Sequence, residues 1–524
     1  MAPHDIAEWE LPRLRTSFIF QDDYKYDSLE DQVASQDLAE FFDVKFYPYN
    51  PPGAPPVFAA TSKKHAVICR LNQTTDKDAN PCKIIQLIRD DGDEANCASC
   101  WSKDPVTHRP WLCLAGNDGN VKVYDVKLGK LVKTLVGHGG GINDIVTSPD
   151  NPLIIASASD DTTIRIWSLA AAHEKQSCVC ILGGEGHSYD LLSVAFHNNG
   201  RYVLSAGHDQ VINLWALPEF PTEHVDVPVV IYYPHFSSSE VHNNLVDCVA
   251  FHGDLILSRA CHEDSIVLWR IEGFSADDPI PAPLDAPTPT DMAKQTRSYF
   301  TPTLSPSRPA MFTRLAQFHT PDCGVQFFMR FRVFHVPGKH PILAFANARS
   351  KTFFWDFSRF SSYSRYMGEL KEAQKLGMSV VEKVGAGEDR NKVQAPMVQK
   401  PPWLMVKKAK RTAAAAVADT ASGLRSVAVG GDKESMVSAS PDPDGATPLS
   451  HSRETLQAWA EMYDLSNPVG NIKAHRALQV DGGFVGRQVG WSPEGEWCVV
   501  VGNGNRALIY QRWGKERGVA TPTA

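Results

Sequence analysis

The sequence has no apolar run long enough to span a membrane, and its start, MAPHDIAEWELPRLR, has no apolar core typical of a secretory signal. Its eleven cysteines show neither the density nor the regular spacing of a secreted disulfide framework. We therefore expect a protein of a reducing compartment that makes no contact with a membrane.

The sequence also has no excess of positive charge. Lysine and arginine number 52 against 60 aspartates and glutamates, which gives a net charge of −8 at pH 7. This balance argues against a protein that binds nucleic acid mainly by electrostatic attraction.

Motifs of catalysis are absent. Neither the phosphate-binding pattern GxxxxGK[ST] nor the zinc-protease pattern HExxH occurs. Cys97 and Cys100 have the spacing of a metal-binding pair, but no clear second pair completes a tetrahedral site. We expect no catalytic residue, no metal site and no cofactor.

A four-residue pattern occurs twice between Gly137 and Leu217. Each copy begins with Gly-His, and the span from His to Trp is 29 positions in one copy and 28 in the other. A repeat of about 40–45 residues with these landmarks is typical of a four-stranded propeller blade. In such a blade the Asp accepts hydrogen bonds in a turn while the Trp packs behind the network, so we expect structural roles. The two sets are His138, Ser157, Asp161 and Trp167, and His187, Ser205, Asp209 and Trp215.

Weaker third strands follow turn clusters elsewhere in the chain. With the two clear copies they predict seven blades, which close a ring and leave no long exposed sheet edge. The segment 16–21 is expected to complete the last blade and tie the chain ends together. The weaker strands are residues 66–69, 121–124, 266–269, 353–355 and 507–510. The predicted fold is all-β, a seven-bladed WD-repeat β-propeller over residues 16–524, preceded by a tail at 1–15.

Two long insertions interrupt this propeller. Residues 277–309 are rich in Pro, Ser and Thr, which predicts a flexible excursion. The second insertion, at about 359–452, contains a possible helix at 368–376, and strand structure is expected to resume at 459–471. Its basic cluster fits a nuclear-import signal, a weak nucleic-acid contact or a solvated run of charge, and the sequence leaves these open. The cluster consists of Lys407, Lys408, Lys410 and Arg411.

Several stretches resemble the EED family of WD-repeat proteins, also known as extra sex combs. They are LVGHGGGIND at 135–144, ILGGEGHSYDLLS at 181–193, NNLVDCVAFHGDLILSRAC at 243–261, FDVKF at 42–46 and FMRF at 328–331. The similarity covers about residues 42–355 and resumes near 461. LVDCV with GDLILS is its most specific part, because ordinary WD repeats do not carry it.

The resemblance implies a non-catalytic reader and scaffold of Polycomb repressive complex 2 in the nucleus. One propeller face would capture trimethyl-lysine of the histone H3 tail in an ARKS context. The opposite face would hold a helix of the SET-domain methyltransferase subunit, of the enhancer-of-zeste type, and reader occupancy would stimulate that enzyme. A zinc-finger VEFS-type Polycomb subunit is a further expected partner. The alternative is a generic WD-repeat adaptor, such as a substrate receptor of a ubiquitin ligase.

The resemblance also assigns candidate site residues. Phe42, Phe327 and Phe328 would form the methyl-lysine cage, because aromatic faces attract a quaternary ammonium group. Cys97 stands four residues before a Trp, where the family has a cage Tyr, and a thiol offers no π face. The pair at 327 and 328 is Phe-Phe where the animal proteins have Trp-Tyr. Arg330 and Arg487 match rim positions that would bind the histone peptide.

Overall fold

The computed structural model describes residues 9–21, 40–72, 79–90, 95–288, 295–300, 311–375, 398, 400–404 and 451–512. Its strands form seven sheets of four or five strands each. The chain divides into two compact units, Met1–Asp356 with Asn467–Ala524, and Phe357–Ser466. The first unit contains all seven sheets.

Each sheet is one blade, and the blades follow one another along the chain. Blade one is β2 (Phe41–Phe46), β3 (Val57–Ser62), β4 (His65–Leu71) and β5 (Cys82–Arg89). Blade two is β6 (Asn96–Lys103), β7 (Pro110–Gly116), β8 (Val121–Asp125) and β9 (Lys130–Leu135). Blade three is β10 (Ile142–Thr147), β11 (Ile154–Ser159), β12 (Ile164–Ser168) and β13 (Cys178–Leu182), with a 3₁₀ turn η1 (Ala171–His173) before β13. Blade four is β14 (Leu191–Phe196), β15 (Tyr202–Gly207), β16 (Ile212–Ala216) and β18 (Phe236–Ser238).

The remaining blades have longer connections. Blade five is β19 (Val246–His252), β20 (Leu255–Ala260), β21 (Ser265–Ile271) and β23 (Phe312–His319), with η2 (Pro283–Asp285) between the last two. Blade six is β24 (Arg332–Phe334), β25 (Ile342–Ala346), β26 (Lys351–Asp356) and β28 (Arg476–Gln479). Blade seven is β29 (Gly486–Trp491), β30 (Trp497–Gly502) and β31 (Arg506–Gln511), completed by β1 (Arg13–Ile19).

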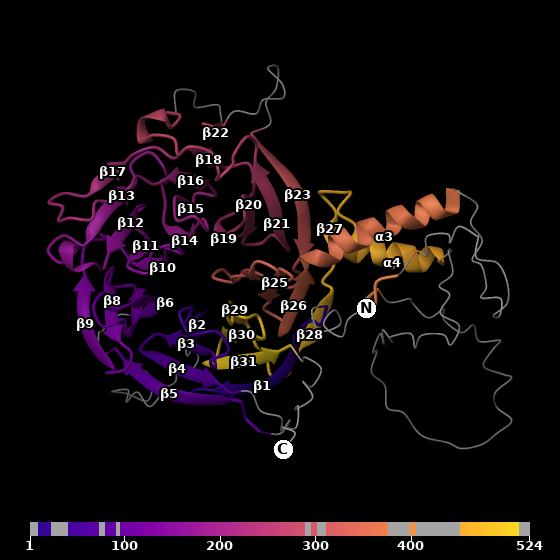
Figure 1. Ribbon diagram of the computed structural model, residues 1–524, viewed down its shortest axis with the longest axis horizontal. Helices are drawn as coiled ribbons and strands as arrows, with labels where there is room; N and C mark the ends of the chain where they lie inside the picture. Colours follow the sequence, from indigo (N-terminus) through magenta and orange to yellow (C-terminus); the bar gives the residue numbers. More distant parts are fainter. Residues whose placement is uncertain are drawn as a thin grey trace, which may run out of the picture. The chain divides into compact units, whose positions relative to one another are not determined.

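The first strands are innermost and contact one another in chain order, and β29 of blade seven packs beside β2 of blade one (Figure 1). The ring is closed by β1, which pairs antiparallel with β31 from Arg13 opposite Gln511 to Ile19 opposite Arg506. This strand begins at Arg13 and ends at Ile19, slightly earlier than the expected 16–21. The prediction of a seven-bladed, all-β propeller is confirmed.

Buried tryptophans fix how the blades stack. Trp167, Trp215, Trp269 and Trp355 end or nearly end the third strands and are at most 1% exposed. A methyl group at Gly186 would lie 2.4 Å from the Trp215 ring, so only glycine allows the preceding chain to approach this closely. The Gly-His start of the repeat therefore reflects packing as well as hydrogen bonding.

Three blades gain a fifth strand from the blade that follows. The connections before β18, β23 and β28 supply β17 (Val229–Ile231), β22 (Thr296–Ser298) and β27 (Asn471–Ile472), which extend blades three, four and five. These strands pair with β13, β18 and β23 and cover edges that would otherwise expose unpaired backbone groups. Part of the expected flexible excursion at 277–309 is therefore ordered as a blade strand.

The prediction of strand structure at 459–471 is wrong over most of its length. Residues Arg453–Tyr463 form helix α4, capped by Ser452, whose side chain accepts from the Thr455 amide. Thr455, Trp459 and Tyr463 recur every fourth residue and are all buried, which is helical spacing. The outer strand of blade six is β28 instead.

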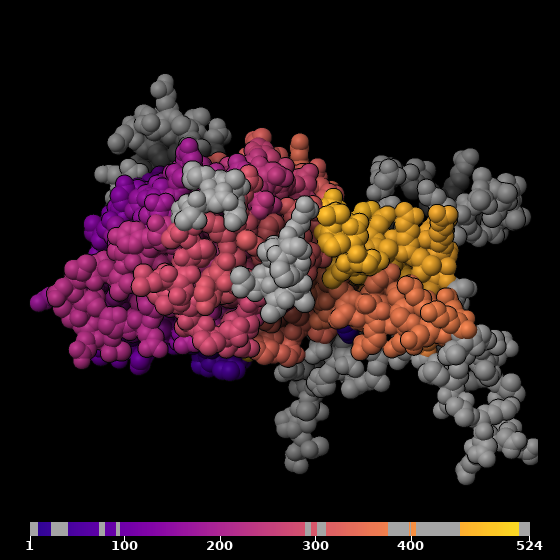
Figure 2. Space-filling view, turned by 90° about the horizontal axis from the view of Figure 1, so that it is seen from above, coloured from indigo at the N-terminus to yellow at the C-terminus, as the bar shows by residue number. Residues whose placement is uncertain are grey.

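The second unit contains α4 and α3 (Phe357–Lys375), which is longer than the expected helix at 368–376. The two helices pack side by side (Figure 2). Their contact is aromatic: the rings of Tyr363 and Tyr463 lie 5.8 Å apart, and Trp403 lies 4.9 Å from Tyr463. The basic cluster at 407–411 lies outside the described residues.

Candidate functional site

The structure brings the four predicted residues of blade three into one chain of hydrogen bonds. His138 Nδ1 lies 2.7 Å from Asp161 Oδ2, and His138 Nε2 lies 2.7 Å from Ser157 Oγ. The Trp167 indole N–H donates to the same hydroxyl over 2.8 Å. Hydrogen bonding therefore runs from the tryptophan through the serine and histidine to the aspartate.

Blade four repeats this chain. His187 lies 2.9 Å from Asp209 and 2.8 Å from Ser205, and Trp215 donates to Ser205 over 2.9 Å. Both histidine side chains are fully buried. Such groups are stable in the interior only when each donor finds an acceptor.

The pKa values of the blade-three pair fit this arrangement. Burial lowers the pKa of the His138 imidazole, although its bond to Asp161 acts in the opposite direction. Burial acts to raise the pKa of Asp161, but the hydrogen bonds from His138 and from the Gly139 amide lower it overall. Near neutral pH a neutral imidazole therefore donates from Nδ1 to an ionised carboxylate, and Nε2 accepts from the Ser157 hydroxyl.

Sequence reasoning missed a third chain, in blade five. His242 lies 2.6 Å from Glu263 and 2.7 Å from Ser258, and Trp269 donates to Ser258 over 2.9 Å. Glutamate here replaces the aspartate, and His242 is not preceded by a glycine, so the Gly-His landmark is missing. The usable signal was spacing, because His242 precedes Trp269 by 27 positions, close to the span of the other two copies.

Phe42 and Cys97 occupy equivalent positions in blades one and two. Each is the second residue of its first strand, at a point where the pairing register with the second strand shifts by one. A β-bulge of this kind re-aims the extra side chain. The same shift recurs in every blade except blade six, and its extra residues are Phe42, Cys97, Asn143, Leu192, Asp247 and Arg487. All six lie where the chain enters a first strand, and we call this side of the ring the entry face.

Blade six departs from the pattern, and its departure carries the predicted phenylalanines. Its first strand begins only at Arg332, and residues 327–330, here called the blade-six arch, run outside the strand ladder. Phe327 is 44% exposed and its ring lies 4.9 Å from that of the half-buried Phe328. His208, in a turn of blade four, lies 6.5 Å from Phe327. The arch therefore presents an aromatic pair on the entry face.

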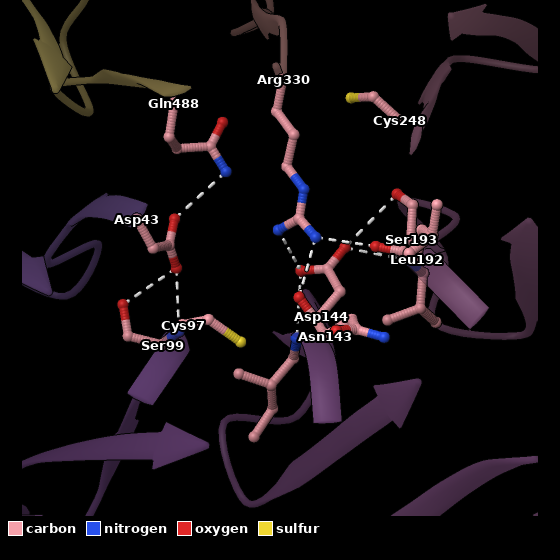
Figure 3. A network of polar contacts seen from close by, with 12 residues as sticks. Asp43, Cys97, Ser99, Asn143, Asp144, Leu192, Ser193, Cys248, Arg330 and Gln488 are labelled. Carbon is pink, nitrogen blue, oxygen red and sulfur yellow. Dashed lines mark hydrogen bonds and ion pairs between the residues drawn. The ribbon is translucent and has the colours of Figure 1, made fainter. Parts of the chain in front are cut away.

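Arg330 lies inside the ring rather than on its rim. The residue is 5% exposed, and its guanidinium reaches from blade six to blades three and four (Figure 3). Nη2 donates to the carbonyl oxygens of Asn143 and Leu192 over 2.8 and 2.7 Å, and Nη1 lies 3.2 Å from Asp144 Oδ1. The sequence analysis expected Arg330 at the rim in contact with peptide, whereas here its terminal nitrogens bind groups of other blades.

Arg487 also faces protein groups. Its Nε donates to Glu40 over 2.6 Å and its Nη1 donates to the Phe327 carbonyl over 2.7 Å. The side chain keeps 15% exposure. Arg487 thus joins blade seven to the segment before Phe42 and to the blade-six arch.

Three buried aspartates that the sequence analysis did not single out connect neighbouring blades. Asp43 accepts from Ser99 of blade two and Gln488 of blade seven, over 2.8 and 3.1 Å (Figure 3). Burial acts to raise the pKa of Asp43, but the charges of Lys45 and Arg330 lower it overall. The three are Asp43, Asp144 and Asp247, each within the first three residues of a first strand. That shared position was the available signal.

Cys97 is partly exposed, and its thiol donates to the Ile142 carbonyl over 3.1 Å. Burial of the sulfur raises the pKa of this thiol to about 12, so it stays protonated and unreactive near neutral pH.

In the part of the chain that the structure describes, no group of three His, Cys, Asp or Glu side chains is placed to hold a metal ion. No helix among the described residues is long and apolar enough to cross a membrane.

The opposite side of the ring, the exit face, carries the turns after the first and third strands. A hollow of about 470 Å³ lies there between blades three and four, lined by apolar groups that include Leu153, Phe220 and Ile280. A second hollow, of about 760 Å³, is lined by polar residues of blades four and five, among them Asn199 and Asp254.

Comparisons with known proteins match both the repeat and the insertion. Residues 129–168 and 176–216 match the family described as WD domain, G-beta repeat, and residues 425–464 match the Polycomb protein EED insertion domain. Polycomb protein EED of Chaetomium thermophilum is 73% identical over 565 aligned positions, which cover all of both chains. Polycomb protein esc of Drosophila melanogaster is 31% identical over 47% of this chain and 59% of its own.

Solved structures agree in fold. A chain of the Chaetomium thermophilum Polycomb repressive complex 2 crystal structure is 75% identical with a TM-score of 0.83, covering 98% of this chain and all of its own. A chain of ctPRC2 in complex with H3K27me3 and H3K27M is 76% identical with a TM-score of 0.84, again over 98% of this chain and all of its own.

Proposed function

The chain belongs to the Polycomb EED family, and from this premise we propose that it reads trimethyl-lysine on the histone H3 tail within Polycomb repressive complex 2. It is a non-catalytic WD-repeat propeller subunit. The observation that carries the reader role is the aromatic pair Phe327–Phe328 on the same face as Phe42.

The chemistry of this site suits a trimethylammonium group. Such a group cannot donate hydrogen bonds, but it is attracted to the faces of aromatic rings by about 0.5–2 kcal/mol per contact. We propose a cage formed by Phe42, Phe327 and Phe328, with Cys97 as a wall that lacks a π face. Phe327 and Phe328 are both accessible enough to meet a ligand.

The arginines take supporting roles in this proposal. Arg487 retains some exposure beside Phe327 and is the remaining candidate for contact with the peptide backbone. Arg330 is already bonded to blades three and four, so we assign it no peptide contact.

The exit face is the proposed docking surface for the catalytic partner. We propose that a helix of the enhancer-of-zeste-type SET-domain methyltransferase lays an apolar stripe along it, and that reader occupancy stimulates this enzyme. A VEFS-type zinc-finger subunit and a nuclear location are further parts of the proposal. The interpretation of the Lys407–Arg411 cluster as an import signal or a nucleic-acid contact remains a prediction. The boundaries of the two insertions, 277–309 and about 359–452, also remain predictions.

Calorimetric titration of the full chain with ARKS-containing H3 peptides tests the reader role. We expect heat of binding with the trimethylated peptide and at least tenfold weaker binding of the unmodified one, a difference of 1.4 kcal/mol or more. Equal affinities for the two peptides would contradict the proposal. Co-purification with a SET-domain subunit rather than with cullin-ligase components would exclude the generic adaptor.

A further inference from the structure

The blade-six arch holds a bulky aromatic residue in an unfavourable backbone conformation. Phe328 has φ of +56°, in the left-handed region that residues with large side chains rarely adopt. Such a conformation persists only where the surrounding structure imposes it, and it is common at ligand-binding sites.

Backbone contacts hold the arch on both sides of Phe328. The Phe327 carbonyl accepts from Arg487 Nη1 over 2.7 Å, and the Met329 amide donates to Asp247 Oδ2 over 3.2 Å. The Arg330 amide donates to the Arg487 carbonyl over 2.8 Å. Blades five and seven therefore fix the main chain before and after Phe328, but none of these bonds reaches its ring.

The Arg330 side chain supplies the remaining restraint. Its three contacts on blades three and four draw the residue inward, and its guanidinium lies 5.5 Å from the centre of the Phe328 ring. Nearby carboxylates offset the effect of burial, so the pKa of Arg330 stays above its ordinary value and the group remains charged. A planar cation held by three acceptors is a rigid support for an aromatic face.

We propose that Arg330 is a positioning residue of the methyl-lysine site, which holds Phe328 in its left-handed conformation without touching the peptide. This inference rests on the proposed reader function. When the guanidinium is removed, the arch relaxes and Phe328 populates the caging orientation only part of the time. The apparent dissociation constant then rises in inverse proportion to the competent fraction.

The test uses the full chain, the trimethylated H3 peptide and three variants. Arg330→Met removes the charge and all three hydrogen bonds, and we expect about tenfold weaker binding, or 1.4 kcal/mol. Arg330→Lys keeps the charge but loses the planar fork, and we expect a smaller loss. Lys122→Met is the matched control, because Lys122 of blade two forms a buried ion pair with Asp90, which follows blade one, over 2.5 Å, and both residues are far along the chain from the arch. It should lower the melting temperature without changing peptide affinity.

Hydrogen exchange in the free chain separates positioning from direct peptide contact. In the Arg330→Met variant, the backbone amides of residues 329 and 330 should exchange faster with no peptide present. If Arg330 acted instead by contacting the peptide, the substitution would leave the exchange rates of these amides in the free chain unchanged. Unchanged exchange or unchanged peptide affinity in a folded Arg330 variant overturns the inference. If Arg330→Met does not fold, Arg330→Lys decides on the same two readouts. Failure of the unaltered chain to prefer the trimethylated peptide would overturn the reader function itself, so the two failures are distinguishable.

Discussion

Phe42 and Cys97 occupy the same position in neighbouring blades, each as the extra residue of a β-bulge at the start of a first strand. One carries an aromatic face and the other a thiol that donates to the Ile142 carbonyl. Blade two therefore lacks an aromatic side chain at the position where blade one has Phe42.

Cys97→Tyr should tighten binding of the trimethylated H3 peptide. The bulge directs this side chain from the same structural position as Phe42, and an added ring contributes about 0.5–2 kcal/mol of cation–π attraction. We expect a gain of up to about thirtyfold in calorimetric titration. Cys97→Ser is the control, since it keeps a small donor for Ile142 and should leave the affinity unchanged. Weaker binding by the tyrosine variant would mean that its ring does not reach the cage.

Asp161→Ala should destabilise the propeller by about 1–3 kcal/mol. The change removes the acceptor for His138 Nδ1, for the Gly139 amide and for the amide and hydroxyl of Thr163. The measurement is the free energy of unfolding in denaturant. Asp226→Ala is the control, because the Asp226 side chain is 94% exposed and only pairs with a solvent-exposed histidine. Equal stability of the two variants would contradict the structural role of the blade-three network.

Stability should fall as the pH is lowered from 7 towards 4. Burial, with a smaller effect of the neighbouring His335, lowers the pKa of His252 to about 4, against about 6.5 in an unfolded chain. Between these values the unfolded state binds a proton that the folded state does not, so acidification favours unfolding. This contribution of His252 to stability is fully present above about pH 6.5 and is lost as the pH falls towards 4.

His252→Phe should flatten this dependence, measured as melting temperature against pH. His224→Gln is the comparison, because it removes a histidine whose ring is 45% exposed rather than buried. Identical slopes in the His252 variant and the unaltered chain would show that another group controls the acid sensitivity.

The repeat was predictable from sequence because its polar residues recur at fixed spacing. One hydrogen-bonded unit within a single repeat contains His138, Asp161 and Trp167. The number of residues between them is therefore similar from one repeat to the next. The blade-five unit was missed because a glutamate replaces the aspartate there, and Glu263 reaches the equivalent histidine, His242, with a longer side chain. The pattern of residue types changed while the geometry did not.

The position of Arg330 was not predictable in this way. Its contacts join residues more than 130 positions apart, and blade six lacks the bulge that marks the equivalent place elsewhere. The added edge strands, such as β27 with two residues, are too short to show periodicity. The helix α4 could have been recognised from the four-residue spacing of Thr455, Trp459 and Tyr463.

The most direct test of the reader function compares Phe328→Ala and Phe328→Leu with the unaltered chain in titrations with the trimethylated and unmodified H3 peptides. We expect the alanine variant to lose about 1–2 kcal/mol, up to about thirtyfold in affinity, for the trimethylated peptide. The leucine variant keeps apolar bulk but no π face and should recover only part of that loss. If neither substitution changes the preference for the trimethylated peptide, Phe328 is not part of a methyl-lysine cage and the proposed site is wrong.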